Sequence, residues 1–149
     1  MRSKSTSKNN GRLRVQLGLG VTVFGFLLFL IGAEPGMFGV DRSPVVGFVQ
    51  IAVFLVGLGI ICLGGYITLA GLWNGRPKTI ASDIGLRLVA TGYVIAVASG
   101  MADVFGFGSQ RFPIVPYFGV YQMMGVMLGE LVVAVGLLLL IPFRPPKAD

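Results

Sequence analysis

The stretch that decides the fold is residues 45–73, which read VVGFVQIAVFLVGLGIICLGGYITLAGLW. It holds no charged residue, and its apolar residues run on without the apolar/polar alternation that marks a half-buried strand. A helix needs about 20 apolar residues to cross a hydrocarbon core about 30 Å thick. The stretch is therefore predicted to form a transmembrane helix.

Three further stretches, residues 15–33, 84–107 and 117–143, are also predominantly apolar and about long enough to cross the hydrocarbon core. Hydrophobic residues make up 54% of the chain and charged residues only 12%, so lipid is the predicted solvent of the folded protein. Continuous apolar runs favour helices over a barrel, whose strands alternate. The predicted fold class is an all-α membrane protein, with four transmembrane helices as two tandem antiparallel hairpins, residues 15–73 and 84–143, forming a left-handed bundle.

The distribution of basic residues predicts the orientation in the membrane. Most Lys and Arg lie in residues 1–14, in or just beyond the connection at 74–83 and in residues 144–149, whereas the other two connections hold one Arg each. Short cytoplasmic segments are enriched in basic residues, so both termini and the 74–83 loop are expected in the cytoplasm. The expected location is the bacterial plasma membrane. The polar tail at 1–14 is expected to be disordered.

A cleavable signal peptide is the alternative interpretation of residues 15–33. The run is longer than the apolar core of a typical signal peptide, and Ile31-Gly32-Ala33 is a poor cleavage site. We therefore expect these residues to remain as the first membrane helix.

The composition excludes several classes of function. His is absent and the single cysteine, Cys62, lies in an apolar run, so the usual zinc and haem ligands and an intramolecular disulfide are not expected. The net charge of +6 is concentrated in tails and loops, which argues against a nucleic-acid partner. No cofactor, metal or catalytic residue is predicted, and the protein is not expected to be an enzyme, because no paired acid and base is evident.

The two halves share a pattern that indicates an internal repeat. Ala33-Glu34 and the later Phe38-Gly39, Arg42 and Pro44 match Ala102-Asp103, Phe107-Gly108, Arg111 and Pro113. After a short insertion, Gln50, Gly57 and Gly64 match Gln122, Gly129 and Gly136. Such parallel repeats are related by an axis along the membrane normal. Chance matching between apolar segments is the alternative.

Small residues recur every seven positions in each apolar run. They are Gly18, Gly25 and Gly32; Gly57, Gly64 and Gly71; Gly85, Gly92, Ser99 and Gly106; and Gly129 and Gly136. A seven-residue period keeps one face toward a partner helix, and small side chains allow the close approach that holds helices together in lipid. The helices are therefore expected to pack tightly, unless the spacing is a coincidence among 23 glycines. Gly125 with Gly129 could serve a second interface.

Two groups of residues are candidate sites. Glu130 lies near the middle of its apolar run, where an ionisable side chain costs several kcal/mol unless it is protonated, paired or hydrated. It is expected to face the interior and to bond a polar residue of another helix, with Tyr93 and Ser99 the main candidates and Thr22 and Thr91 further ones. A structural hydrogen bond and a functional proton or ion site both remain open.

The second group is a pair of acid–base combinations in the outer connections, Glu34 with Arg42 and Asp103 with Arg111. The favoured interpretation is a clamp in which Arg binds the carboxylate bidentately and fixes the loop. The alternative is that two symmetric carboxylates attract a cation.

These observations lead to two hypotheses about function. The first is a non-enzymatic accessory or scaffold subunit that packs through its glycine-lined helix faces, as a homo-oligomer or within a larger membrane complex. The second is a small transporter or channel component with Glu130 as an intramembrane proton or ion site. The expected surroundings in both cases are the lipid bilayer.

Overall fold

The computed structural model describes residues 2–39, 47–108 and 118–143, and these residues are helices and the turns between them. The helices are α1 (Arg2–Ala33), the short 3-10 helix η1 (Pro35–Phe38), α2 (Phe48–Trp73), α3 (Ile80–Gly100) and α4 (Val120–Leu139). Each of α1 to α4 contains a segment long and apolar enough to cross a membrane, which in α1 is Asn10–Ala33. The chain is therefore an integral membrane protein.

The helix ends differ from the predicted ones where local signals act. α1 begins at Arg2, so the backbone of residues 2–14 is helical although their composition predicts a disordered tail. Lys and Arg are good helix formers and no proline interrupts the run, so the helix can extend from its apolar part without a new nucleus. α3 begins at Ile80 because the Thr79 side chain accepts a hydrogen bond from the Ser82 amide at 3.3 Å.

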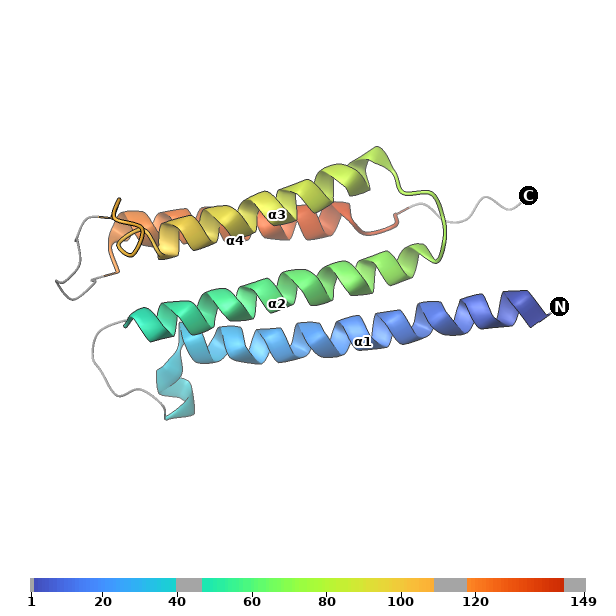
Figure 1. Ribbon diagram of the computed structural model, residues 1–149, viewed down its shortest axis with the longest axis horizontal. Helices are drawn as coiled ribbons and strands as arrows, with labels where there is room; N and C mark the ends of the chain where they lie inside the picture. The colour runs from blue at the N-terminus through green and yellow to red at the C-terminus, as the bar shows by residue number, and fades with distance from the viewer. Residues whose placement is uncertain (1, 40–46, 109–117, 144–149) are drawn as a thin grey trace.

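The four long helices form two antiparallel hairpins, as predicted (Figure 1). α1 packs along α2, and α3 packs along α4. The hairpins meet through α2, which touches α3 and α4 over a much smaller contact than either hairpin has inside it. The first residues of α1 and α3 and the last residues of α2 and α4 lie at the same end of the molecule (Figure 1).

Glycine determines how closely the helices of each hairpin approach. We call these contacts the glycine seams: Gly18, Gly25 and Gly32 with Gly57, Gly64 and Gly71 in the first hairpin, and Gly85, Gly92 and Ser99 with Gly125, Gly129 and Gly136 in the second. A Cβ added at Gly64 would lie 2.5 Å from the Thr22 nitrogen, and one at Gly136 would lie 2.7 Å from the Val89 nitrogen. The seven-residue spacing therefore marks the surfaces on which the helices meet.

Gly106 and Gly125 differ from their predicted roles. Gly106 lies beyond the end of α3, has a φ of 83° and has no atom near the place of a Cβ, so it serves a turn. Gly125 lies against the Ser99 side chain inside the second hairpin, and this contact occupies the face suggested for a second interface.

The opposite face of α2 forms the contact between the hairpins. Its buried residues are Ile51, Leu55, Leu58 and Cys62, which pack against apolar side chains of α3 and α4. Hydrogen bonds also join the hairpins: Trp73 Nε1 donates to the Leu140 carbonyl at 2.9 Å, and the Tyr93 hydroxyl donates to the Leu55 carbonyl at 3.3 Å. Trp73 is thus buried and holds the hairpins together at their connected end.

A short, well-defined connection links α2 to α3. Asn74 and Gly75 both take left-handed backbone conformations, with φ of 46° and 82°, which turn the chain sharply after Trp73. Arg76 donates to the Leu72 and Trp73 carbonyls, both at 3.2 Å, and so satisfies the end of α2. The connection therefore keeps the two hairpins next to each other at this end.

Candidate functional site

Glu130 lies near the middle of α4. It comes ten residues after Val120, the first residue of α4. At a rise of about 1.5 Å per residue this places it roughly 15 Å into a hydrocarbon core about 30 Å thick. Its side chain is half-buried, and its Oε1 atom is buried without a hydrogen-bond partner among the residues that the structure describes. A buried polar atom without a partner in lipid costs free energy, so this oxygen is a candidate binding group.

The Glu130 side chain lines a cavity of about 460 Å³ between the hairpins. We call it the Glu130 cavity. α1 contributes Phe29, Gly32 and Ala33; α2 contributes Gln50, Ile51 and Phe54; and Phe118, Met123, Val126 and Met127 line it beside Glu130. The lining is mainly apolar, and Gln50 is the other side chain with a strongly polar group. The cavity thus combines a carboxyl, an amide and an aromatic wall.

The first glycine seam builds the aromatic wall of this cavity. Gly32 contacts the backbone of Phe54, and Gly57 contacts the backbone of Phe29. This close approach brings the rings of Phe29 and Phe54 together with their centroids 4.6 Å apart and their planes tilted by 35°. A substitution in the seam would therefore also disturb the surface that faces Glu130.

The polar residues proposed as partners of Glu130 have other contacts. Thr22 donates to the Gly18 carbonyl of its own helix at 2.8 Å, and Tyr93 is bonded to Leu55 on α2. Ser99 lies against Gly125, and Thr91 is exposed. Ser99 and Tyr93 do not line the Glu130 cavity, so the described part of the chain does not bring this predicted set together.

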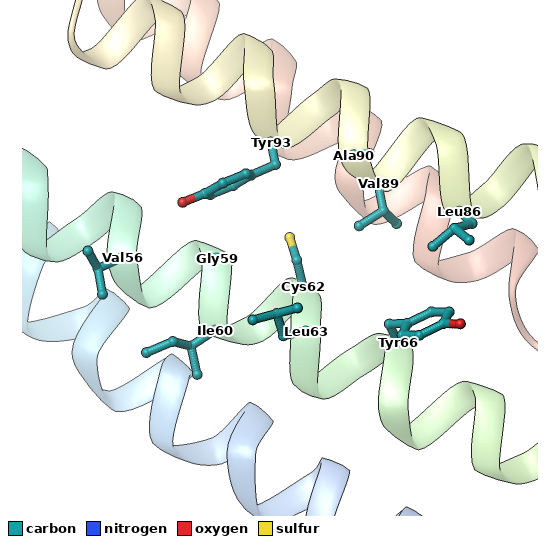
Figure 2. A pocket seen from close by; sticks show the side chains of 10 residues that line it. All are labelled: Val56, Gly59, Ile60, Cys62, Leu63, Tyr66, Leu86, Val89, Ala90 and Tyr93. Atoms are coloured by element: carbon teal, nitrogen blue, oxygen red, sulfur yellow. The ribbon is translucent and has the colours of Figure 1, made fainter.

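Tyr93 instead lines a second cavity, of about 490 Å³, between α2 and α3. Figure 2 shows the Tyr93 ring and the Cys62 sulfur projecting into the space between these helices, with Tyr66 toward the other end. Gly59 leaves room for the Tyr93 hydroxyl, because a Cβ there would lie 2.7 Å from it. The rest of the lining is aliphatic apart from glycine, so this cavity offers no ionisable carboxyl or amine.

The acidic residues of the outer connections differ in their surroundings. Glu34 is exposed just before η1, whereas Asp103 is buried and accepts a hydrogen bond from Gln122 Nε2 at 2.9 Å. Gln122 Oε1 also accepts from the Gly119 amide at 2.7 Å, so the Gln122 side chain links Asp103 to the start of α4. Arg42 and Arg111 lie outside the described residues, and the two predicted acid–base pairs stay predictions.

Metal ligands do not gather anywhere in residues 2–39, 47–108 or 118–143, where no three Cys, Asp or Glu side chains are close enough to share an ion. The Glu130 cavity has one carboxyl and one amide, which is fewer oxygen ligands than a bound Ca²⁺ or Mg²⁺ takes. Its chemistry therefore suits proton binding or a single positive charge.

Comparison of the chain with protein families, with curated proteins and with solved structures finds no match.

Proposed function

We propose that this chain is a small transporter or channel component, without enzymatic activity, in which Glu130 is an intramembrane proton or ion site. The observation that carries the proposal is the Glu130 side chain, whose buried Oε1 atom has no partner among the described residues and which lines a cavity between the hairpins. Ionisable side chains inside membrane segments are rare and often mark proton and ion pathways.

The division into two hairpins would allow the protein to change its conformation when Glu130 gains or loses its charge. Inside each hairpin the glycine seams hold the helices at backbone contact, whereas the hairpins share a thinner contact. A neutral Glu130 is compatible with an apolar cavity, but an ionised one requires water or a cation. The proposal is that the hairpins move relative to each other as Glu130 changes its charge.

An accessory or scaffold subunit is the second candidate function. It is favoured by the scarcity of polar groups in the Glu130 cavity, where only Gln50 accompanies Glu130 and no continuous polar path is evident among the described residues. Assembly of such a subunit through its glycine-lined helix faces has less support, because the described seam glycines contact the partner helix of their own hairpin. Purification in mild detergent distinguishes the two, since an accessory subunit should retain a larger partner in stoichiometric amount.

The orientation, the location and the assembly are part of the proposal. The described ends of the helices support both termini in the cytoplasm, because the start of α1 and the connection between α2 and α3 lie at the same end of the molecule (Figure 1). The first half of α1 carries Arg12 and Arg14, and the connection carries Arg76 and Lys78. Glu34 and Asp103 lie toward the other end. We place the protein in a bacterial plasma membrane as a homo-oligomer or part of a larger complex, which would supply the remaining lining of a path. The left-handed arrangement of the four helices belongs to the same proposal.

Infrared difference spectroscopy in lipid bilayers tests the proton or ion site. Between acidic and alkaline pH, the parent should lose the band of a protonated carboxyl and regain it on reversal. Glu130→Gln should lack this change, because the amide keeps the shape of the side chain but does not titrate. Asp83→Asn is the matched control, since Asp83 is exposed in the first turn of α3 and outside the cavity. If the folded parent and Glu130→Gln gave the same difference spectrum, Glu130 would not be the site.

A further inference from the structure

The size and lining of the Glu130 cavity point to a class of ligand. Its volume of about 460 Å³ lies within the range of pockets that hold small organic molecules, roughly 300–1,000 Å³. A bare inorganic ion would leave most of this space empty and would find few oxygen ligands. The aromatic rings of Phe29 and Phe54 form one wall, and the flexible side chains of Met123 and Met127 contribute to the lining.

The Glu130 carboxyl among the lining residues restricts the class of ligand further. An acyl chain or another neutral apolar molecule could fill the cavity, but it would bring no opposite charge to this carboxyl when it is ionised. A positive charge is attracted both by a carboxylate and by the faces of aromatic rings, and both attractions are stronger when water is excluded. Charge and apolar surface are thus required in the same ligand.

We infer that the Glu130 cavity binds an amphipathic monovalent organic cation of the quaternary ammonium or phosphonium type. This inference rests on the proposed function of Glu130 as a proton or ion site. The charged centre lies at the Glu130 carboxylate and the apolar groups lie against Phe29, Phe54 and Met127. Gln50, in the first turn of α2, supplies the second polar group.

Binding of this cation exchanges one positive charge for another. The protonated carboxyl of Glu130 releases its proton to water, and the carboxylate that remains pairs with the incoming cation, so charge in the cavity is conserved. The carboxyl O–H bond breaks, the proton bonds to water, and no covalent bond forms between the cation and the protein. Proton and cation therefore compete, and acidification weakens cation binding.

Titration of the purified protein in lipid nanodiscs with tetraphenylphosphonium tests the inference. Calorimetry gives the affinity, and a pH indicator in weak buffer gives the protons released. We expect saturable binding above that of empty nanodiscs, one proton released per cation, and affinity that falls about tenfold per pH unit where Glu130 is protonated. Neutral triphenylphosphine oxide, of similar shape, should release no proton.

Variants separate the contributions of the carboxyl and of the aromatic wall. Glu130→Gln should bind tetraphenylphosphonium at least about tenfold more weakly, without proton release or pH dependence. Phe54→Leu should keep the one-proton release but bind about two- to fivefold more weakly, because it removes a cation–π contact worth about 0.5–1 kcal/mol. Asp83→Asn should behave like the parent. If Glu130→Gln does not fold, the proton release of the parent and the Phe54→Leu variant still decide the question.

The outcomes distinguish this inference from the proposed function. Absence of saturable binding, binding without proton release, or unchanged binding by a folded Glu130→Gln would overturn the organic-cation inference. If the infrared titration of Glu130 is seen in the same sample, the proposed proton or ion site stands without this ligand. If Glu130 does not titrate, both fail.

Discussion

At Gly64 an added Cβ would lie 2.5 Å from the Thr22 amide nitrogen, a distance that real Cβ atoms do not reach, so α1 and α2 would have to separate. At Gly20, on α1, the same atom would meet nothing within 4 Å. The sequence alone separates these two glycines, because Gly64 belongs to the seven-residue pattern and Gly20 does not. It does not give the identity of the atoms that face Gly64, which depends on how the two helices are aligned.

Gly64→Ala should destabilise the protein by about 1–3 kcal/mol, since an extra methyl group in a tight contact forces backbone movement. Gly20→Ala is the matched control, and it should be neutral or stabilising by up to about 1 kcal/mol because alanine favours the helix. Reversible unfolding in mixed detergent micelles measures both. Equal effects of the two substitutions would mean that the first seam does not hold the hairpin together.

The contact between Tyr93 and Gly59 supplies a second prediction at this scale. Tyr93→Phe should cost about 0.6 kcal/mol, the usual value for a hydrogen bond between membrane helices, because it removes the bond to the Leu55 carbonyl. Gly59→Ala should destabilise the parent protein more than it destabilises the Tyr93→Phe variant, since the added Cβ would lie 2.7 Å from the Tyr93 hydroxyl. A double-mutant cycle measures this difference. Additive effects would show that the two side chains do not meet.

The four helices illustrate what apolar patterning reveals and what it does not. The four runs were sufficient to predict four membrane helices and their pairing into hairpins. They did not give the end of α3, because residues 101–106 remain largely apolar while the backbone turns, with Gly106 at a φ of 83°. The start of α3 depends on a polar cap at Thr79, a signal that an apolar run does not contain.

The two hairpins also use similar contacts. Gly64 faces the Thr22 amide in the first hairpin, and Gly136 faces the Val89 amide in the second. If Thr22 and Val89 are corresponding positions, the offset between the two halves is two residues shorter in these helices than in the outer connections. The second half would then contain a small insertion between its first helix and its outer connection. This correspondence supports the proposal of an internal repeat and explains why one offset does not align both halves throughout.

Each hairpin should respond to damage in its own seam. Gly64→Leu should speed amide hydrogen exchange in α1 and α2 and leave α3 and α4 almost unchanged, because the contact between hairpins is thin. Gly136→Leu should produce the reverse pattern. Hydrogen exchange followed by mass spectrometry resolves the helices. Equal loosening of all four helices by either variant would show that the hairpins are not separate units.

Among the described residues, the two ends of the molecule differ in basic side chains, and this asymmetry predicts the orientation. Arg76 and Lys78 lie in the connection between the hairpins, whereas η1 at the opposite end has no basic residue. In a Cys62→Ala background, Met37→Cys should react with a membrane-impermeant thiol reagent on spheroplasts. Lys78→Cys should react only after the membrane is opened. Both side chains are exposed, so a reversed labelling pattern would overturn the proposed topology.

The candidate site could be predicted only in part, because it is a property of the whole molecule. Its depth in an apolar run was sufficient to identify Glu130. The other members of the cavity, such as Gln50, Phe29 and Phe54, come from α1 and α2 and adjoin Glu130 only through the way in which the hairpins meet. Tyr93 was placed at a suitable depth, but its hydroxyl is bonded to Leu55 and does not line the Glu130 cavity.

The proposed function requires two rigid hairpins that change their separation with the charge of Glu130. Electron paramagnetic resonance distances between spin labels in lipid test it most directly, in the Cys62→Ala background. Val23→Cys with Leu63→Cys reports on the first hairpin, and Val23→Cys with Leu131→Cys reports on the separation of α1 from α4. All three side chains are exposed and lie outside the Glu130 cavity.

When the pH rises through the range in which the Glu130 carboxyl band disappears, the α1–α4 distance distribution should shift while the α1–α2 distribution stays fixed. The physical reason is that an ionised carboxylate requires water or a cation in the cavity. Glu130→Gln should keep the acidic-pH distribution at every pH. An α1–α4 distance that is the same at every pH in the parent, or an α1–α2 distance that shifts equally, would contradict the claim.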